Sequence, residues 1–140
     1  MTLLVDTSVW SLALRRDAEA PGPEVQELKD ALFGADVVVT TGLVLQELLQ
    51  GFLGAKARTL IIERFAALPV LQPDREDHIG AATLRNACRQ AGVQIGTIDA
   101  LLAQLAIRHD LTLLTTDKDF THAAKHCTLR VWPAQTRVKQ

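Results

Sequence analysis

Residues 96–120 read GTIDALLAQLAIRHDLTLLTTDKDF, and the pattern of these 25 residues indicates the fold class. The apolar residues between Ile98 and His109 predict a helix. The run Leu111 to Thr115 is apolar on both alternating faces, which is typical of a strand that is covered on two sides in a parallel sheet. Asp117 follows that strand directly, and Asp99 lies in the first turn of the helix. This unit predicts an α/β fold with acidic residues at the ends of its elements.

The same alternation of strands and helices extends over the rest of the chain. Further strands are predicted at Leu3 to Val5, Val37 to Thr40 and Leu129 to Trp132, with a weaker one at Val70 to Leu71 between Pro69 and Pro73. Helices are predicted at Val9 to Leu14, Glu24 to Phe33, Leu43 to Phe52, Ala55 to Leu68, from Asp74 to a C-cap at Gly92, and at Lys118 to Ala124. Such alternation predicts a three-layer α/β/α sandwich with a mainly parallel sheet of four or five strands.

Composition is that of a globular protein. With 48% hydrophobic and 22% charged residues among 140, the chain is neither disordered nor collagen-like, and we expect one domain over residues 1–140. No stretch reaches the roughly 18 apolar residues of a membrane span, and the start, MTLLVD, has no pattern of a secretion signal. Cys88 and Cys127 form no CxxC motif, which argues against a zinc site or a disulfide scaffold. We therefore expect a cytoplasmic protein without a membrane partner.

Four acids fall where a parallel sheet binds its ligands. Ligands of such sheets bind beyond the carboxyl ends of the strands. Asp6 and Asp117 each come directly after a predicted strand, and Asp99 lies at the start of a helix that we expect Thr97 to cap. Glu47 is a single acid within an apolar helix, and a buried charge needs a partner. We expect the four carboxylates to meet at one mouth of the sheet.

Clustered carboxylates predict a metal ion. Neighbouring carboxylates repel each other, whereas Mg²⁺ or Mn²⁺ prefers oxygen ligands and supports hydrolysis of phosphodiesters. We expect Asp6, Asp99 and Asp117 to be metal ligands, with Glu47 and Asp119 as further candidates. Neutralising four of the 16 acids changes the net charge of the rest from −1 to +3, which leaves basic residues free for phosphate. Those candidates are Arg15, Arg16, Lys56, Arg58, Arg64, Arg85, Arg89, Arg108 and Lys118.

Three motifs carry a resemblance to a known family. VDTS at 5–8, QELLQG at 46–51 and the stretch 96–120, in this order, resemble a PIN-domain protein of the VapC toxin type. The resemblance implies a parallel sheet between helices and cleavage of RNA with Mg²⁺ or Mn²⁺. It also implies a cognate VapB antitoxin as partner. Its motif acids map onto Asp6, Glu47, Asp99 and Asp117, with Asp119 as a frequent second acid.

These features together predict a mechanism and a set of partners. Asp6, Asp99 and Asp117 would hold one or two metals, and Glu47 would bind metal or position the attacking water. In-line attack on the RNA would follow, with no covalent enzyme intermediate. Apolar residues in excess of one core face at 43–52 and 60–68 predict a partner surface, either a homodimer seam or a groove for an antitoxin peptide. DNA would be contacted only through the antitoxin.

Alternatives remain for the whole chain and for single residues. The chain could be a housekeeping RNA-processing nuclease, or a regulatory binding module in complex with a DNA-binding partner. A phosphatase of the haloacid dehalogenase type would need an acid at the position of Ser8. Local roles are also open: Asp6 as a helix cap, Asp99 as a partner of the helix dipole, Asp119 as a cap, Trp10 as core or as a base-stacking residue, and His122 with His126 as a surface pair.

Overall fold

All strand pairs of the five-stranded sheet are parallel, where a mainly parallel sheet of four or five strands was predicted. The computed structural model describes residues 1–15, 22–34 and 36–133. The strands are β1 (Thr2–Val5), β2 (Val37–Thr41), β3 (Val70–Leu71), β4 (Thr112–Leu114) and β5 (Arg130–Val131), in the order β3-β2-β1-β4-β5. The chain builds outward from β1 to β3 on one side and then adds β4 and β5 on the other. The strand order therefore reverses at β1, where parallel sheets open a crevice for ligands.

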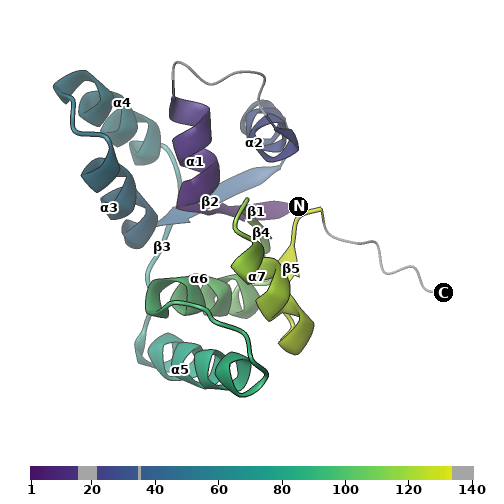
Figure 1. The fold of residues 1–140 in the computed structure, drawn as a ribbon. Helices are drawn as coiled ribbons and strands as arrows, with labels where there is room; N and C mark the ends of the chain where they lie inside the picture. Colours follow the sequence, from purple (N-terminus) through teal and green to yellow (C-terminus); the bar gives the residue numbers. More distant parts are fainter. Residues whose placement is uncertain (16–21, 35, 134–140) are drawn as a thin grey trace.

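Helices cover both faces of this sheet. They are α1 (Thr7–Leu14), α2 (Pro23–Phe33), α3 (Gly42–Gly51), α4 (Ala55–Ala66), α5 (Arg75–Gln90), α6 (Thr97–Arg108) and α7 (Lys118–Ala123), followed by the 3₁₀ turn η1 (Ala124–His126). Helices α1 to α4 lie on one side of the sheet and the antiparallel pair α5 and α6 on the other (Figure 1). The predicted three-layer sandwich is confirmed. No helix within the described residues is long and apolar enough to span a bilayer.

The helix ends agree with the sequence patterns in part. Asp74 caps α5, where it forms a reciprocal capping box with Asp77, and the Thr41 hydroxyl caps α3 by accepting from the backbone N–H of Val44. The predicted cap of α6 was wrong, because Thr97 is already helical and Gly96 occupies the cap position without a side-chain bond. A glycine in extended backbone conformation serves there, so the adjacent hydroxyl is not needed.

Apolar side chains from both layers meet on β1 and β4. Leu4 and Leu113 are fully buried in the two strands, and Phe120 of α7 is fully buried as well. Trp10 is 4% exposed, and its ring centroid lies 4.8 Å from that of Phe65. Trp10 is therefore a core residue, and the suggestion that it stacks on a base was wrong.

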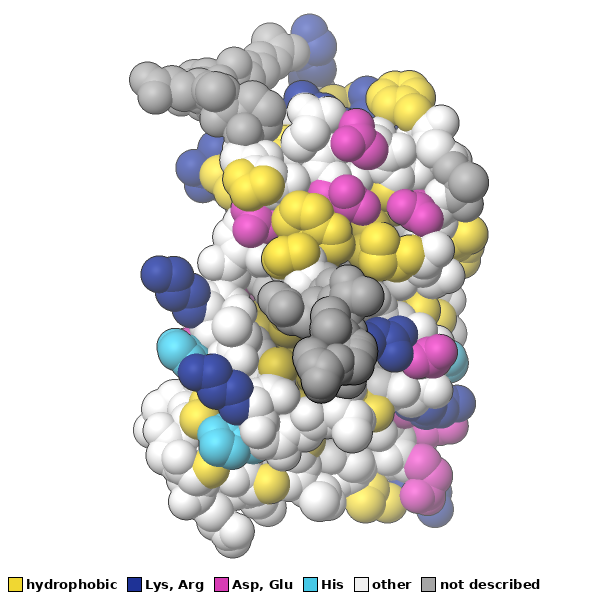
Figure 2. All heavy atoms as spheres, turned by 90° about the vertical axis from the view of Figure 1, so that its right-hand side faces the viewer, with side chains coloured by type: hydrophobic (Ala, Val, Ile, Leu, Met, Phe, Trp, Pro, Cys, Tyr) yellow, Lys and Arg dark blue, Asp and Glu magenta, His cyan; other side chains and the backbone are white. Residues whose placement is uncertain are grey.

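Apolar side chains also reach the surface. The most exposed are Phe33 at 92% and Leu53 at 87%. Hydrophobic side chains gather in the upper half of the face shown in Figure 2, with acidic side chains around them. Exposed apolar groups in a cluster commonly mark a contact surface.

Candidate active site

Asp6 lies at the carboxyl end of β1, next to the end of β4. The register pairs Val5 with Leu114, and the backbone N–H of Asp6 donates to the carbonyl of Leu114 at 2.9 Å. The hydroxyls of Ser8 and Thr115 both donate to Oδ2 of Asp6, each at 2.8 Å. Asp6 occupies the cap position of α1, but its side chain makes no capping bond, so Asp6 is not a side-chain cap. Its carboxylate is buried and held in place by two hydroxyl groups.

Thr115 joins Asp6 to Asp117. The Thr115 hydroxyl donates to Asp6, and its oxygen accepts from the backbone N–H of Asp117 at 3.0 Å. The Ser8 oxygen accepts in parallel from the backbone N–H of Thr116 at 3.1 Å. Asp6 and Thr115 are 109 positions apart in the chain and Ser8 and Thr116 are 108 apart, so no local sequence pattern predicts these two contacts. The hydrogen bonds of the Ser8 and Thr115 hydroxyls join the ends of β1 and β4, so they depend on the pairing of these two strands.

Asp117, rather than Asp119, caps α7. Oδ1 of Asp117 accepts from the backbone N–H of Asp119 at 2.9 Å. The side chain of Asp119 is exposed. Asp119 therefore does not cap α7, because its backbone N–H rather than its carboxylate takes part in the capping hydrogen bond.

Glu47 reaches the same region from α3. Its Oε1 accepts a hydrogen bond from the hydroxyl of Thr7 at 2.7 Å, and the side chain is half-buried. Thr7 and Ser8 both lie inside the first turn of α1, and their hydroxyls donate to Glu47 and Asp6. Glu47, an acid in an apolar helix, was expected to have a partner, and that partner is the hydroxyl group of Thr7.

Asp99 shows that the acids are close to one another. Burial is the largest cause that raises the pKa of Asp99 to about 6, and the negative charges of Asp6, Asp117, Glu47 and Asp119 contribute to the same rise in that order. Neighbouring charges change the pKa of a carboxyl group only when they are close to it and incompletely screened by water. The structure thus brings all five acids that the sequence singled out into one site.

The site presents oxygen atoms suited to a hard cation. Asp6, Glu47 and Asp117 each have one carboxylate oxygen held by a hydrogen bond, and among the described residues the other oxygen has no such bond. No three His, Cys, Asp or Glu side chains in that part of the chain are arranged to hold a metal ion by themselves. Mg²⁺ usually keeps several waters beside one or two carboxylates, so this donor set fits a partly hydrated divalent ion.

Some of the basic residues that were candidates for binding phosphate form contacts within the protein instead. Arg108 pairs with Asp77 at 2.6 Å, and Nε of Arg85 donates to the carbonyl of Ile95 at 2.9 Å. Arg16 lies outside the described residues. Cations for phosphate are therefore to be sought near the acids themselves.

Thr115 provides a first test of the hydroxyl bridge. A Thr115→Val variant keeps the shape of the side chain but loses both hydrogen bonds, so Asp6 keeps only the Ser8 hydroxyl and the backbone N–H of Asp117 loses its acceptor. We expect RNA cleavage by this variant to fall roughly 10- to 100-fold, as happens when supporting partners of metal ligands are removed. Thr115→Ser, which keeps the hydroxyl, should retain most of the rate. Equal rates for wild type and Thr115→Val would exclude a positioning role.

Burial of Asp99 and repulsion by its acidic neighbours predict that Asp99→Asn is more stable than wild type when no metal is bound. The unfolded chain loses the Asp99 proton near pH 4, whereas the folded chain keeps it up to about pH 6. The folded state binds more protons in that window, so rising pH destabilises it. We expect Asp99→Asn to be about 1 kcal/mol more stable than wild type at pH 7.5 in EDTA, after allowance for solvent screening.

Thermal unfolding with EDTA measures this difference. The gap between Asp99→Asn and wild type should shrink at pH 5, where Asp99 is mostly protonated in the folded protein. Added Mg²⁺ should stabilise wild type more than the variant, since binding to the folded state adds to stability. A variant less stable than wild type at pH 7.5 in EDTA would contradict the repulsion.

Comparison with known proteins identifies the family. The PIN-domain profile matches residues 3–126. Over 125 residues the chain is 31% identical to a VapC ribonuclease of Mycobacterium bovis and to the ribonuclease VapC11 of Mycobacterium tuberculosis, a span that covers 88% of this chain and 92% of each relative. The chain belongs to the PIN-domain family and, within it, to the VapC ribonucleases.

A solved structure shares the fold. The chain superposes on the VapBC2 complex of Rickettsia felis bound to a promoter DNA fragment with a TM-score of 0.73 at 20% identity. The superposition covers 94% of this chain and 97% of that one. At such low identity the match confirms the α/β architecture alone.

Proposed function

We propose that this chain is a divalent-metal-dependent endoribonuclease that acts as the toxin of a toxin–antitoxin pair. The observation that carries the proposal is the convergence of acids: the Thr115 hydroxyl joins Asp6 to the backbone of Asp117, and the charges of Asp6, Asp117, Glu47 and Asp119 all raise the pKa of Asp99. Two of the relatives are named ribonucleases. A site of this kind, with oxygen donors only, is suited to phosphodiester hydrolysis.

Each acid has a proposed role. Asp6, Asp99 and Asp117 would hold Mg²⁺ or Mn²⁺, with Asp119 as the candidate for a further oxygen. A bound divalent ion supplies positive charge that stabilises the negative charge developing on a phosphodiester. Glu47 keeps one oxygen on the Thr7 hydroxyl, and its other oxygen would bind metal or accept a proton from the attacking water. Hydrolysis by water in line with the leaving oxygen needs no covalent intermediate.

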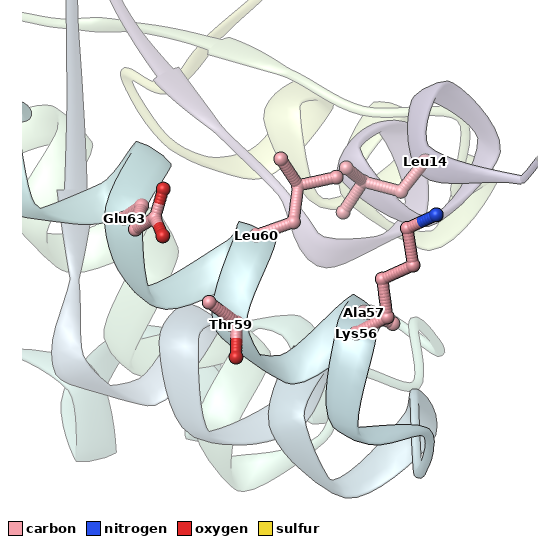
Figure 3. Close-up of a pocket in the computed structure, with 6 residues that line it drawn as sticks. All are labelled: Leu14, Lys56, Ala57, Thr59, Leu60 and Glu63. Atoms are coloured by element: carbon pink, nitrogen blue, oxygen red, sulfur yellow. The ribbon is translucent and has the colours of Figure 1, made fainter.

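The proposed protein partner is a VapB-like antitoxin. A hollow of about 670 Å³ lies between α1 and α4 and is lined by Leu14, Lys56, Ala57, Thr59, Leu60 and Glu63. The side chains of Leu14 and Leu60 extend toward each other there, and charges of both signs flank them (Figure 3). Such a surface suits an amphipathic peptide segment. Promoter DNA would then be contacted through the antitoxin, and a homodimer and a cytoplasmic location stay predictions.

RNA cleavage by the purified protein tests the proposal. Wild type and Asp99→Asn are incubated with total RNA in Mg²⁺, in Mn²⁺ and in EDTA, after mass spectrometry has excluded a co-purified inhibitor. We expect cleavage by wild type with metal only, and none by Asp99→Asn. Equal behaviour of the two proteins would overturn the carboxylate nuclease. A small reading frame directly upstream that neutralises growth arrest on co-expression separates a toxin from a housekeeping nuclease.

A further inference from the structure

A second hollow lies beside the acidic site. Its volume is about 420 Å³. It is lined by Gly92, Val93 and Gln94 from the turn between α5 and α6, and by Asp119, His122, Lys125 and His126 from α7 and η1. The volume falls within the range of roughly 300–1,000 Å³ typical of small-molecule sites. The hollow therefore has room for a nucleotide-sized group.

Asp119 connects this hollow to the acids. Its side chain lines the hollow, and its backbone N–H donates to Oδ1 of Asp117 at 2.9 Å. The other polar side chains follow on the same short segment, with His122 three positions beyond Asp119 and Lys125 three positions further. A nucleic acid whose reacting phosphate lay at the acids would therefore have this hollow next to its path.

The hollow presents positive charge and N–H donors, which the acidic site does not provide. Lys125 contributes a positive charge, and the rings of His122 and His126 contribute N–H donors in either protonation state. All three side chains are exposed, and within the described part of the chain none of them forms an ion pair. In Figure 2, histidine side chains lie next to Lys or Arg side chains along the left-hand edge of the lower half. A polyanion repelled by five acids needs such cations close by.

We propose that this hollow is a nucleotide subsite for single-stranded RNA, in which Lys125, His122 and His126 bind the phosphate next to the one that is cleaved. The inference rests on the proposed nuclease function and names the form of its substrate. A nucleotide must leave its base pair to enter a hollow of this size, whereas a duplex is read mainly by shape. Backbone at Gly92, whose φ of +82° favours glycine, borders the hollow without a side chain.

Binding and cleavage of a fluorescein-labelled single-stranded RNA of mixed sequence test the subsite. Lys125→Ala and the pair His122→Gln with His126→Gln are compared with Lys29→Ala, which removes an equal charge from exposed α2. Cleavage is followed in the otherwise wild-type protein, and binding by anisotropy in Asp99→Asn with Mg²⁺. We expect Lys125→Ala to raise KM and Kd roughly 10-fold with kcat within about twofold, and Lys125→Arg to restore both.

The salt dependence of binding and the binding of a duplex give two further tests of the subsite. Loss of one phosphate contact should lower the slope of log Kd against log salt concentration by about 0.7 for a single strand. A duplex of the same sequence should bind the Lys125→Ala and Lys29→Ala proteins equally.

The outcomes separate the subsite from the nuclease. If wild type cleaves RNA and the hollow variants match Lys29→Ala, the subsite is overturned and the nuclease stands. If wild type binds RNA without cleaving it and Lys125→Ala weakens binding, the subsite stands and the nuclease falls. If single-stranded RNA does not bind at all, both are overturned.

Discussion

Asp6→Asn is expected to slow RNA cleavage about 10³-fold, since a divalent ion contributes several kcal/mol of charge stabilisation and every 1.36 kcal/mol is a factor of ten. Asparagine has the same shape, and its amide oxygen can still accept from Ser8 and Thr115. The change therefore removes the negative charge while leaving the hydroxyl contacts available. Single-turnover cleavage rates at saturating Mg²⁺ measure the loss.

Asp30→Asn is the matched control for this experiment. Asp30 is an exposed acid of α2, where it accepts from Gln26, and its neutralisation makes the same chemical change away from the site. We expect its cleavage rate to stay within about twofold of wild type. A folded Asp6→Asn protein that cleaves as fast as Asp30→Asn would rule out Asp6 as a ligand that matters to the reaction.

The second large effect concerns the stability of the α5–α6 pair. Asp77 is completely buried at the start of α5, and its Oδ2 accepts from Arg108 of α6 at 2.6 Å and from the backbone N–H of Asp74 at 2.9 Å. Arg108→Ala leaves that carboxylate buried without its counter-charge. We expect the free energy of unfolding to fall by about 3 kcal/mol, because an unpaired buried charge is costly. Urea unfolding at pH 7 measures it.

A double-mutant cycle tests the cause of that loss. In an Asp77→Asn background the buried charge is gone, so Arg108→Ala should cost less than about 1 kcal/mol. Arg89→Ala, on the exposed face of α5, should change stability by less than about 0.5 kcal/mol. If Arg108→Ala costs the same with and without the Asp77 charge, the effect comes from packing of the arginine stem rather than from the ion pair.

The sequence predicted the positions of the acids well for a physical reason. In a parallel sheet, a residue that follows a buried strand must lie at the carboxyl edge, so Asp6 and Asp117 were assigned to one edge from their order in the chain alone. Helix caps were predicted less reliably. Asp74 was correct, but Thr97 was not, because the capping residue depends on the backbone angles of a single position.

Local patterns by themselves determined the strands, the helices and the edge at which the acids lie, because hydrophobic periodicity and chain order act over short distances. Which side chains touch depends on how the elements pack against one another in three dimensions. Thr115 and Asp6 are 109 positions apart, and Arg108 and Asp77 are 31 apart. Hydrogen bonds of this kind form within about 3 Å, so they depend on strand register and helix packing to a precision that no local pattern contains. The hollow beside Asp119 likewise exists only once α7 packs next to the turn between α5 and α6.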